Sequence, residues 1–304
     1  MGTEQQYDFG KKRFSDSDQI TRDYFDSLLL ETRYIDAVLP STQLKLFGET
    51  FTTPIMTAAL SHLNSTCEDG MVKYAQGAKD AGAVHWVGMG SDSELERIID
   101  TGARSIKIIK PHADNKEVFR KIEHANEVGA FAIGMDIDHA FSSDGTYDTV
   151  LGLPMCSKSS KELKEFVKAS VAPFIVKGVL SVTDAKKCVD VGVKGILLSH
   201  HHGIMEYSVP PLFVLPKIVE AVGNEIPVFI DCGIESGMDV YKALALGASA
   251  VCVGRHLMKP LKTGAAAVTE RIMKMNGELA AVMARTGVKS LDDMDSTVIW
   301  YRNF

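Results

Sequence analysis

The sequence lacks several features that mark specialised classes of protein. Its five cysteines, among 304 residues, form no CxxC pair and show no Cys/His spacing typical of zinc sites, so we expect reduced thiols and no metal. Dense Lys/Arg runs are absent and the formal net charge is -6, which argues against nucleic acid or an anionic membrane as the main partner. A small-molecule substrate is the better expectation.

Long apolar segments are absent as well. No run approaches the roughly 20 residues that cross a bilayer, and the first residues lack the apolar centre of a secretory signal. These absences predict a cytoplasmic protein. With 45% hydrophobic content the chain can bury a large core, and a single domain over 1–304 is expected.

Short apolar runs alternate with longer amphipathic stretches, a pattern typical of parallel strands joined by helices. The predicted strands are 54–60, 83–88, 105–109, 131–136, 173–177, 194–199, 227–231 and 249–254. Helices are predicted between them, for example over 114–128, 181–191 and 237–246. Eight strands alternating with helices predict an α/β fold, the (β/α)8 TIM barrel.

Two stretches fall outside this alternation. Residues 1–50 precede the first strand, carry a helical pattern at 17–30, and predict an N-terminal extension over the barrel. Residues 139–159 form the longest stretch without strong periodicity and follow a predicted strand. A loop of that length at a strand end is typical of a lid or substrate loop.

Polar residues at the carboxyl ends of barrel strands are candidates for chemistry. Lys177 ends the fifth strand, where its ammonium could stabilise negative charge on a ligand or form an internal ion pair. After Ser199 come three consecutive histidines, 200–202, a weak zinc signal because neighbouring side chains on an extended loop point in different directions. One imidazole acting as general base is more economical, and ordinary polar loop residues are the alternative.

Glycines follow the last two predicted strands, in DCGIESG (231–237) and VGR (253–255). In barrels these two loops commonly hold a phosphate with backbone N–H groups, and Arg255 adds a cation. The sequence therefore predicts a phosphate-bearing ligand.

At these residues the chain resembles the FMN-dependent 2-hydroxy-acid oxidases and dehydrogenases, a family that includes glycolate oxidase and lactate oxidase. The resemblance spans most of the chain and is densest in PFIVKGVLSVTDAKKCVDVGVKGILLSHHHG (173–203) and IPVFIDCGIESGMDVYKALALGASAVCVGR (226–255). It implies an FMN-binding TIM barrel and a homo-oligomer, a tetramer in this family.

The resemblance also implies which residues contact FMN. Lys177 corresponds to the lysine that stabilises the reduced, anionic flavin, and Ser199 to a residue near its pyrimidine edge. The other expected contacts come from the first and the last two strand ends: Ala58, Ala59, Leu60, Asp231, Gly233, Gly254 and Arg255.

The family's catalytic histidine stands third in an SNHG motif. An ungapped match places it at His201, whereas a one-residue insertion would place it at His202. The aspartate that orients this histidine falls on Asp138, with Asp136 as the alternative.

The substrate side departs from the family. The arginine that binds the substrate carboxylate falls on Ile204, and the family's Arg-rich loop is replaced by DIDHAF, so an ordinary 2-hydroxy acid is in doubt. Two family tyrosines fall on Lys107 and, with an offset, on Tyr7; these two residues and His139 are the candidate substrate contacts. On the phosphate side, Glu235 replaces an arginine.

These observations predict an FMN-dependent enzyme that oxidises a small hydroxy compound. The alternatives are a flavin-dependent, non-redox isomerase and a non-catalytic binding protein descended from the oxidases. An isomerase of diphosphates would require more cationic loops than this chain carries. Retention of Lys177 and of a histidine at the expected strand end weighs against the binding protein.

Overall fold

Eight parallel strands form the centre of the molecule in a computed structural model that describes residues 16–302. They are hydrogen-bonded in the order β4-β13-β12-β11-β10-β7-β6-β5, and a parallel bridge between Leu60 and Val87 closes the ring from the β4 side to β5. The strands are β4 Ile55–Thr57, β5 His85–Val87, β6 Ser105–Ile109, β7 Ala132–Asp136, β10 Phe174–Lys177, β11 Gly195–Leu198, β12 Val228–Ile230 and β13 Ala250–Val253. The predicted TIM barrel is confirmed, and each predicted strand contains one observed strand.

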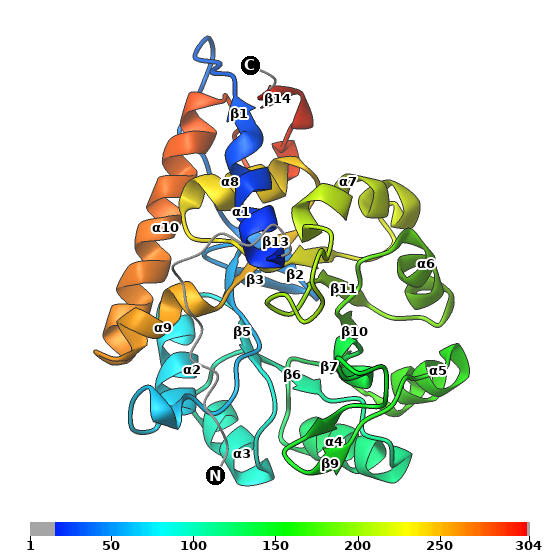
Figure 1. Cartoon of the computed structure of the whole chain (residues 1–304). Helices are drawn as coiled ribbons and strands as arrows, with labels where there is room; N and C mark the ends of the chain where they lie inside the picture. Colours follow the sequence, from blue (N-terminus) through cyan, green and yellow to red (C-terminus); the bar gives the residue numbers. More distant parts are fainter. Residues whose placement is uncertain (1–15, 303–304) are drawn as a thin grey trace.

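Helices follow the strands and surround them (Figure 1). They are α2 Gly70–Asp80, α3 Asp92–Asp100, α4 Asn115–Glu127, α5 Ser160–Ala169, α6 Val182–Asp190, α7 Pro211–Val222, α8 Gly237–Ala245, α9 Arg255–Leu261 and α10 Ala265–Arg285. Serine N-caps fix several starts: Ser91, Ser181 and Ser236 each accept a hydrogen bond from the amide three residues ahead, and Ser159 forms a capping box with Glu162. A cap of this kind stabilises a helix by about 1 kcal/mol.

Alternation along the strands sorts buried side chains into two cores. Inside the barrel, Met56, Trp86 and Phe229 pack together, with the Trp86 and Phe229 rings 5.6 Å apart and edge to face. Their neighbours Ile55 and Ile230 face the helices and join the larger outer core. A filled interior leaves ligand chemistry to the strand ends.

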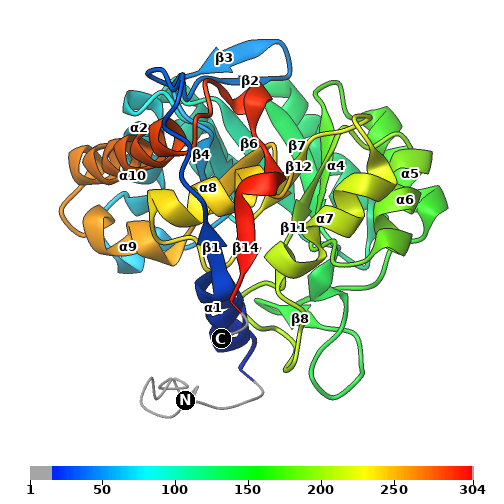
Figure 2. The same cartoon turned by 90° about the horizontal axis from the view of Figure 1, so that it is seen from above.

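Segments from the early and the late part of the described chain pair beside the barrel. Helix α1, Ser17–Ser27, leads into β1, Leu28–Leu30, which pairs antiparallel with β14, Ile299–Tyr301 (Figure 2). The helix predicted at 17–30 therefore ends at Ser27, because the next three residues pair with the far end of the chain. A hairpin of β2 Leu44–Leu46 and β3 Glu49–Phe51 follows.

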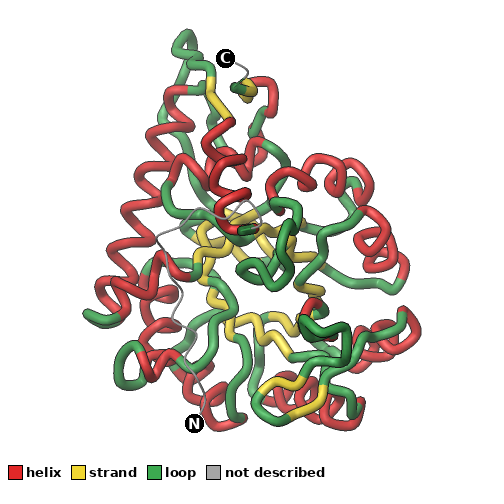
Figure 3. The backbone as a smooth tube through the Cα atoms, viewed as in Figure 1, coloured by secondary structure: helices red, strands yellow, loops and turns green. Residues whose placement is uncertain are grey.

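The stretch predicted as an irregular loop at 139–159 contains some regular structure. A short 3-10 helix, η2 Asp138–Ala140, opens it, and a small hairpin of β8 Thr149–Val150 and β9 Leu153–Pro154 follows (Figure 3). Three further 3-10 helices are η1 Leu63–Ser65, η3 Leu291–Asp293 and η4 Ser296–Val298. Within residues 16–302, no helix combines the length and the apolarity needed to span a membrane.

Candidate active site

Charged side chains meet at the carboxyl ends of β7 and β10. Lys177 and Asp136 are the last residues of these neighbouring strands and lie opposite each other in the register. Because Ile175 belongs to the inner core, Lys177, two residues on, also points into the barrel. The Lys177 Nζ lies 3.2 Å from Asp136 Oδ1 and 3.4 Å from Asp138 Oδ2. Lys177 thus lies at the strand end, as expected, and forms the internal ion pair that was the alternative to a ligand contact.

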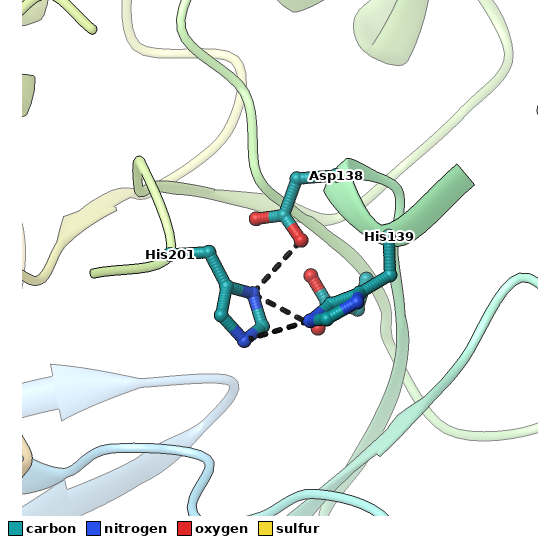
Figure 4. Close-up of side chains that lie close together, drawn as sticks. Asp138, His139 and His201 are labelled. Carbon is teal, nitrogen blue, oxygen red and sulfur yellow. Dashed lines mark hydrogen bonds and ion pairs between the residues drawn. The ribbon is translucent and has the colours of Figure 1, made fainter. Parts of the chain in front are cut away.

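His201 joins this group from the loop after β11. Its Nδ1 lies 2.8 Å from Asp138 Oδ1 (Figure 4). The same atom lies 3.4 Å from Asp136 Oδ2 and 2.9 Å from Lys177 Nζ. The backbone adopts a left-handed φ of 47°, and its amide donates to the Ser199 hydroxyl at 3.1 Å. This turn aims the imidazole across the barrel mouth toward the end of β7.

A second histidine lies on the other side of the His201 ring. His139 Nε2 is 3.0 Å from His201 Nε2, and His139 Nδ1 is 3.0 Å from Asp148 Oδ2 (Figure 4 shows the two rings). Carboxylates accept hydrogen bonds, so Asp138 and Asp148 favour a proton on the Nδ1 of His201 and of His139, respectively, whereas the Lys177 ammonium opposes it at His201. With both Nδ1 atoms protonated, the contact between the two Nε2 atoms is a hydrogen bond only when one ring is an imidazolium.

Electrostatics decide which ring carries that proton. Burial and the Lys177 ammonium lower the pKa of His201, but hydrogen bonds to Asp136 and Asp138 outweigh them and raise it above the ordinary value. Burial lowers the pKa of His139. Of the two rings, His201 therefore binds a second proton more readily.

The pKa values of the two aspartates shift in opposite directions. Burial raises the pKa of Asp136, yet the charges of Lys177 and Lys110 and the contact with His201 bring it well below its usual range. Asp138 has a raised pKa because burial and the charge of Asp136 outweigh the attraction of Lys177. Burial also acts on Lys177, but the two carboxylates raise its pKa, so it remains an ammonium.

Four of these side chains offer the ligand types that metals bind. Ligand atoms of Asp136, Asp138, His139 and His201 all lie within 4.8 Å of one another. Ammonium groups already neutralise the carboxylates, since the Lys110 Nζ also lies 2.7 Å from Asp136 Oδ2. A further cation would have to displace these contacts, so the arrangement favours proton transfer over metal binding.

A cavity of about 590 Å³ opens beside Lys177 and His201. Its volume is in the range of small-molecule and cofactor sites. The cavity wall at Gly254 is closely packed, because a Cβ added to this glycine would lie 3.2 Å from Ala58 Cβ. All the expected cofactor contacts except Ser199 line it: Ala58, Ala59, Leu60, Lys177, Asp231, Gly233, Gly254 and Arg255.

The three consecutive histidines separate into three environments. His202 points away from His201 and forms an ion pair with Asp18 of α1, which also accepts two hydrogen bonds from Arg255, at 2.9 and 3.0 Å. Burial raises the pKa of Asp18, but contacts with His202 and Arg255 lower it to about 2. His200 is buried, and its Nε2 lies 2.8 Å from the Thr21 hydroxyl of the same helix.

Lys107, an expected substrate contact, lies outside the group around His201. Ile106 and Ile108 face the inner core, so Lys107 between them faces the helices, where its ammonium donates to the Gly88 carbonyl. Burial there lowers the pKa of Lys107 to about 8. Lys107, which the resemblance matches to a substrate-contacting tyrosine, thus points away from the barrel interior. Tyr7, the other candidate, lies outside the described residues.

The sequence interpretation missed three residues near the site. Lys110 reaches Asp136 from the end of β6, and Asp148 reaches His139 from the start of the small hairpin. Arg22 of α1 donates to the Gly233 carbonyl at 3.0 Å. Lys110 could have been predicted, because it lies two residues after the inward-facing Ile108 and so shares its face of the strand. The contacts of Asp148 and Arg22 have no local signal in the sequence.

Known proteins resemble this chain over most of its length. A sequence profile described as FMN-dependent dehydrogenase matches residues 5–160 and 155–301. A 2-hydroxyacid oxidase of Dictyostelium discoideum is 26% identical over 94% of this chain and 84% of its own length, and glycolate oxidase 3 of Arabidopsis thaliana is 28% identical over 92% and 87%. A structure of a mandelate oxidase variant with an FMN adduct superposes with a TM-score of 0.85 at 27% identity, covering 94% of this chain and 92% of that one.

Proposed function

Because this chain belongs to the FMN-dependent dehydrogenase family, whose cofactor is FMN, we propose that it binds FMN and oxidises a small hydroxy compound with His201 as the base. One observation carries the proposal. An imidazole held by Asp138 lies in contact with a buried lysine, and both line the cavity formed by the expected cofactor residues.

The residues around the cavity fit FMN. Lys177 offers a buried ammonium to negative charge on the ring, and Asp231 and Gly233 offer polar groups to the ribityl chain. Arg255 lies at the end where the phosphate is expected. When bound, FMN would supply the acceptor for the hydride equivalent.

His201 takes the proton of the substrate hydroxyl at Nε2. This role requires the neutral ring with the proton on Nδ1, and the Asp138 carboxylate, 2.8 Å from Nδ1, selects that tautomer. Nε2 now faces His139, so the substrate hydroxyl must replace His139 there. His139 lies in η2, at the start of the 139–159 stretch, and displacement of this segment would admit the substrate.

The substrate side points to a compound that is not recognised by paired arginines. Ile204, at the position of the family's carboxylate-binding arginine, is an exposed side chain. Besides Lys177, the group around His201 includes the cation Lys110, whose ammonium is engaged by Asp136. A hydroxy compound that contacts Lys110 fits this arrangement better than one held through a bidentate guanidinium fork.

The test is flavin binding followed by anaerobic reduction. The purified protein, saturated with FMN, is mixed without oxygen with a panel of hydroxy acids and neutral hydroxy compounds, and the flavin absorbance is followed. Bleaching by a hydroxy compound supports the proposal. A protein that binds FMN but is bleached by no hydroxy compound favours the isomerase or the binding protein, and a protein that binds no FMN refutes the proposal.

A further inference from the structure

The phosphate end of the cavity presents a carboxylate where the family carries an arginine. Glu235 lines this end and is exposed, and its charge repels a phosphate group. Arg255, the cation at the same end, is engaged by both oxygens of Asp18. Recognition of a phosphate at this end therefore requires hydrogen-bond donors in addition to Arg255.

His256 is a donor whose tautomer is fixed. Its Nε2 lies 2.8 Å from Nε of Arg271, and the N–H of a guanidinium can only donate. The His256 Nε2 must therefore accept, so the proton of the neutral ring is on Nδ1. His256 lines the cavity and is partly exposed to it, and the Nδ1–H is the remaining donor of the ring.

Arg271 brings a positive charge to the same place from α10. Its side chain is 19% exposed, and its Nη2 donates to the Glu235 carbonyl at 2.8 Å. The carboxylate that pairs with this guanidinium, Glu278, lies 3.7 Å away and also accepts from the Gly237 amide. The charge of Arg271 is thus only weakly paired and lies behind His256 and the 231–237 loop.

Arginines also orient the backbone of this loop. Arg22 holds the Gly233 carbonyl and Arg271 holds the Glu235 carbonyl. Since C=O and N–H point in opposite directions across a trans peptide, the amides of Ile234 and Ser236 face away from these guanidinium groups. Within residues 16–302 neither amide has a recorded acceptor, and Ile234 lines the cavity.

We propose that His256, through its Nδ1–H, and Arg271, through its charge behind that ring, recognise the phosphate of the bound ligand in place of the arginine that Glu235 replaces. The ligand class is a phosphate monoester, and FMN is the member that the proposed function supplies. The inference rests on that function for the identity of FMN, but the donor arrangement itself does not.

The test compares FMN with riboflavin, which lacks the phosphate. We expect Arg271→Met to weaken FMN binding by about tenfold to a hundredfold, as for loss of a charge-assisted contact, and to change riboflavin binding by less than about threefold. Lys274→Met is the matched control, because Lys274 is an exposed cation on the same helix. It should leave both dissociation constants unchanged. Fluorescence quenching of each flavin measures them.

Substitutions of His256 separate a donor from a packing role. His256→Asn keeps an N–H near the Nδ1 position and should retain most of the preference for FMN, whereas His256→Leu should lose it. A nitrogen-15 spectrum of the wild-type protein should show the Nδ1–H tautomer, and Arg271→Met should release it. Equal losses for FMN and riboflavin, or no loss for either, would overturn the proposal.

Inorganic phosphate distinguishes failure of this inference from failure of the proposed function. In the wild-type protein it should shift the His256 resonances and compete with FMN but not with riboflavin. If no flavin binds while phosphate still shifts His256, the FMN function fails and the phosphate site stands. If both flavins bind with equal affinity, flavin binding stands and the phosphate site fails.

Discussion

The two sides of the barrel mouth are built in different ways. On the β12 and β13 side, backbone groups of glycine-containing loops line the cavity, and arginines from α1 and α10 fix the 231–237 loop from behind. On the β7 side, ionisable side chains contact one another directly, from Lys110 and Asp136 to His201 and His139. The β12 and β13 side provides a cavity with hydrogen-bond donors, and the β7 side provides side chains that can exchange protons.

This difference explains where the chain departs from its family. Backbone donors tolerate the replacement of a side chain such as Glu235, because the loop geometry is set by contacts made elsewhere. On the β7 side the chemistry belongs to the side chains, so Ile204, where the family resemblance implies an arginine, and His139 opposite His201 would change what can bind. We therefore expect substitutions on the β7 side to change catalysis and those on the other side to change ligand affinity.

The largest effect should come from the lysine shared by both sides. Lys177→Met removes the buried ammonium beside the expected flavin ring and should slow anaerobic flavin reduction by at least about 10³-fold. Lys107→Met is a matched control, because Lys107 is equally buried but faces the helices. It should leave the reduction rate near that of the wild type. A large loss in Lys107→Met would restore Lys107 as a substrate contact, and full reduction in Lys177→Met would refute the role of Lys177.

The next effect should come from the aspartate that holds the catalytic base. Asp138→Asn leaves the shape of the side chain but removes the charge that favours the His201 imidazolium, and we expect a loss of about 10²-fold in reduction rate. Since the pKa of His201 is raised in the folded protein, the rate should rise with pH as the imidazolium loses its proton. In Asp138→Asn this transition should move to lower pH.

Proton NMR titration of His201 supplies a readout for this prediction that needs no substrate. The His201 pKa should lie above that of a free imidazole in the wild type and fall in Asp138→Asn. Glu206→Gln, a substitution in the same loop outside the group around His201, serves as the control. An unchanged His201 pKa in Asp138→Asn would mean that Asp136 alone sets it.

The contrast between the two sides also describes what could be predicted from the sequence. Strands and glycine loops are local features, and the cavity-lining loops after β12 and β13 could be predicted from them, whereas Ala58, Ala59 and Leu60 after β4 were implied by the family resemblance. The end of α1 could not, because Leu28–Leu30 pairs with residues at the opposite end of the chain. The contacts of Arg22 and Arg271 with the 231–237 loop are long-range for the same reason.

Side-chain direction at single residues was the other limit. Lys107 was assigned to the site one residue away from the inward-facing positions of β6, and a shift of one residue in a strand changes the face. His201 and His202 could be distinguished only loosely from the sequence. Both take a left-handed φ, 47° and 58°, and their side chains reach different partners, Asp138 and Asp18.

A smaller effect should follow from the contact that covers His201. His139→Ala removes the ring from Nε2 of His201 and leaves Asp148 without its histidine partner. If the substrate hydroxyl replaces His139, this variant should change KM by about tenfold while kcat changes less, because the interaction affects access more than the transition state. His124→Ala, a histidine on α4 that contacts Glu96, is the control. A loss confined to kcat would instead place His139 in the chemical step.

The smallest effect should appear at the Asp18–Arg255 pair. Asp18→Asn frees the guanidinium of Arg255 for the phosphate and should tighten FMN binding by a few-fold, with riboflavin binding unchanged.

The pair also predicts a pH dependence of stability. The pKa of Asp18 falls from 3.8 to about 2 on folding, so its contribution is present above pH 3.8 and is lost as the pH falls toward 2. As the pH is lowered through this range, the thermal unfolding temperature should therefore fall more steeply in the wild type than in Asp18→Asn. Parallel profiles would show that the contact is too solvent-exposed to stabilise the fold, and an unchanged affinity for FMN would show that Arg255 does not reach the phosphate.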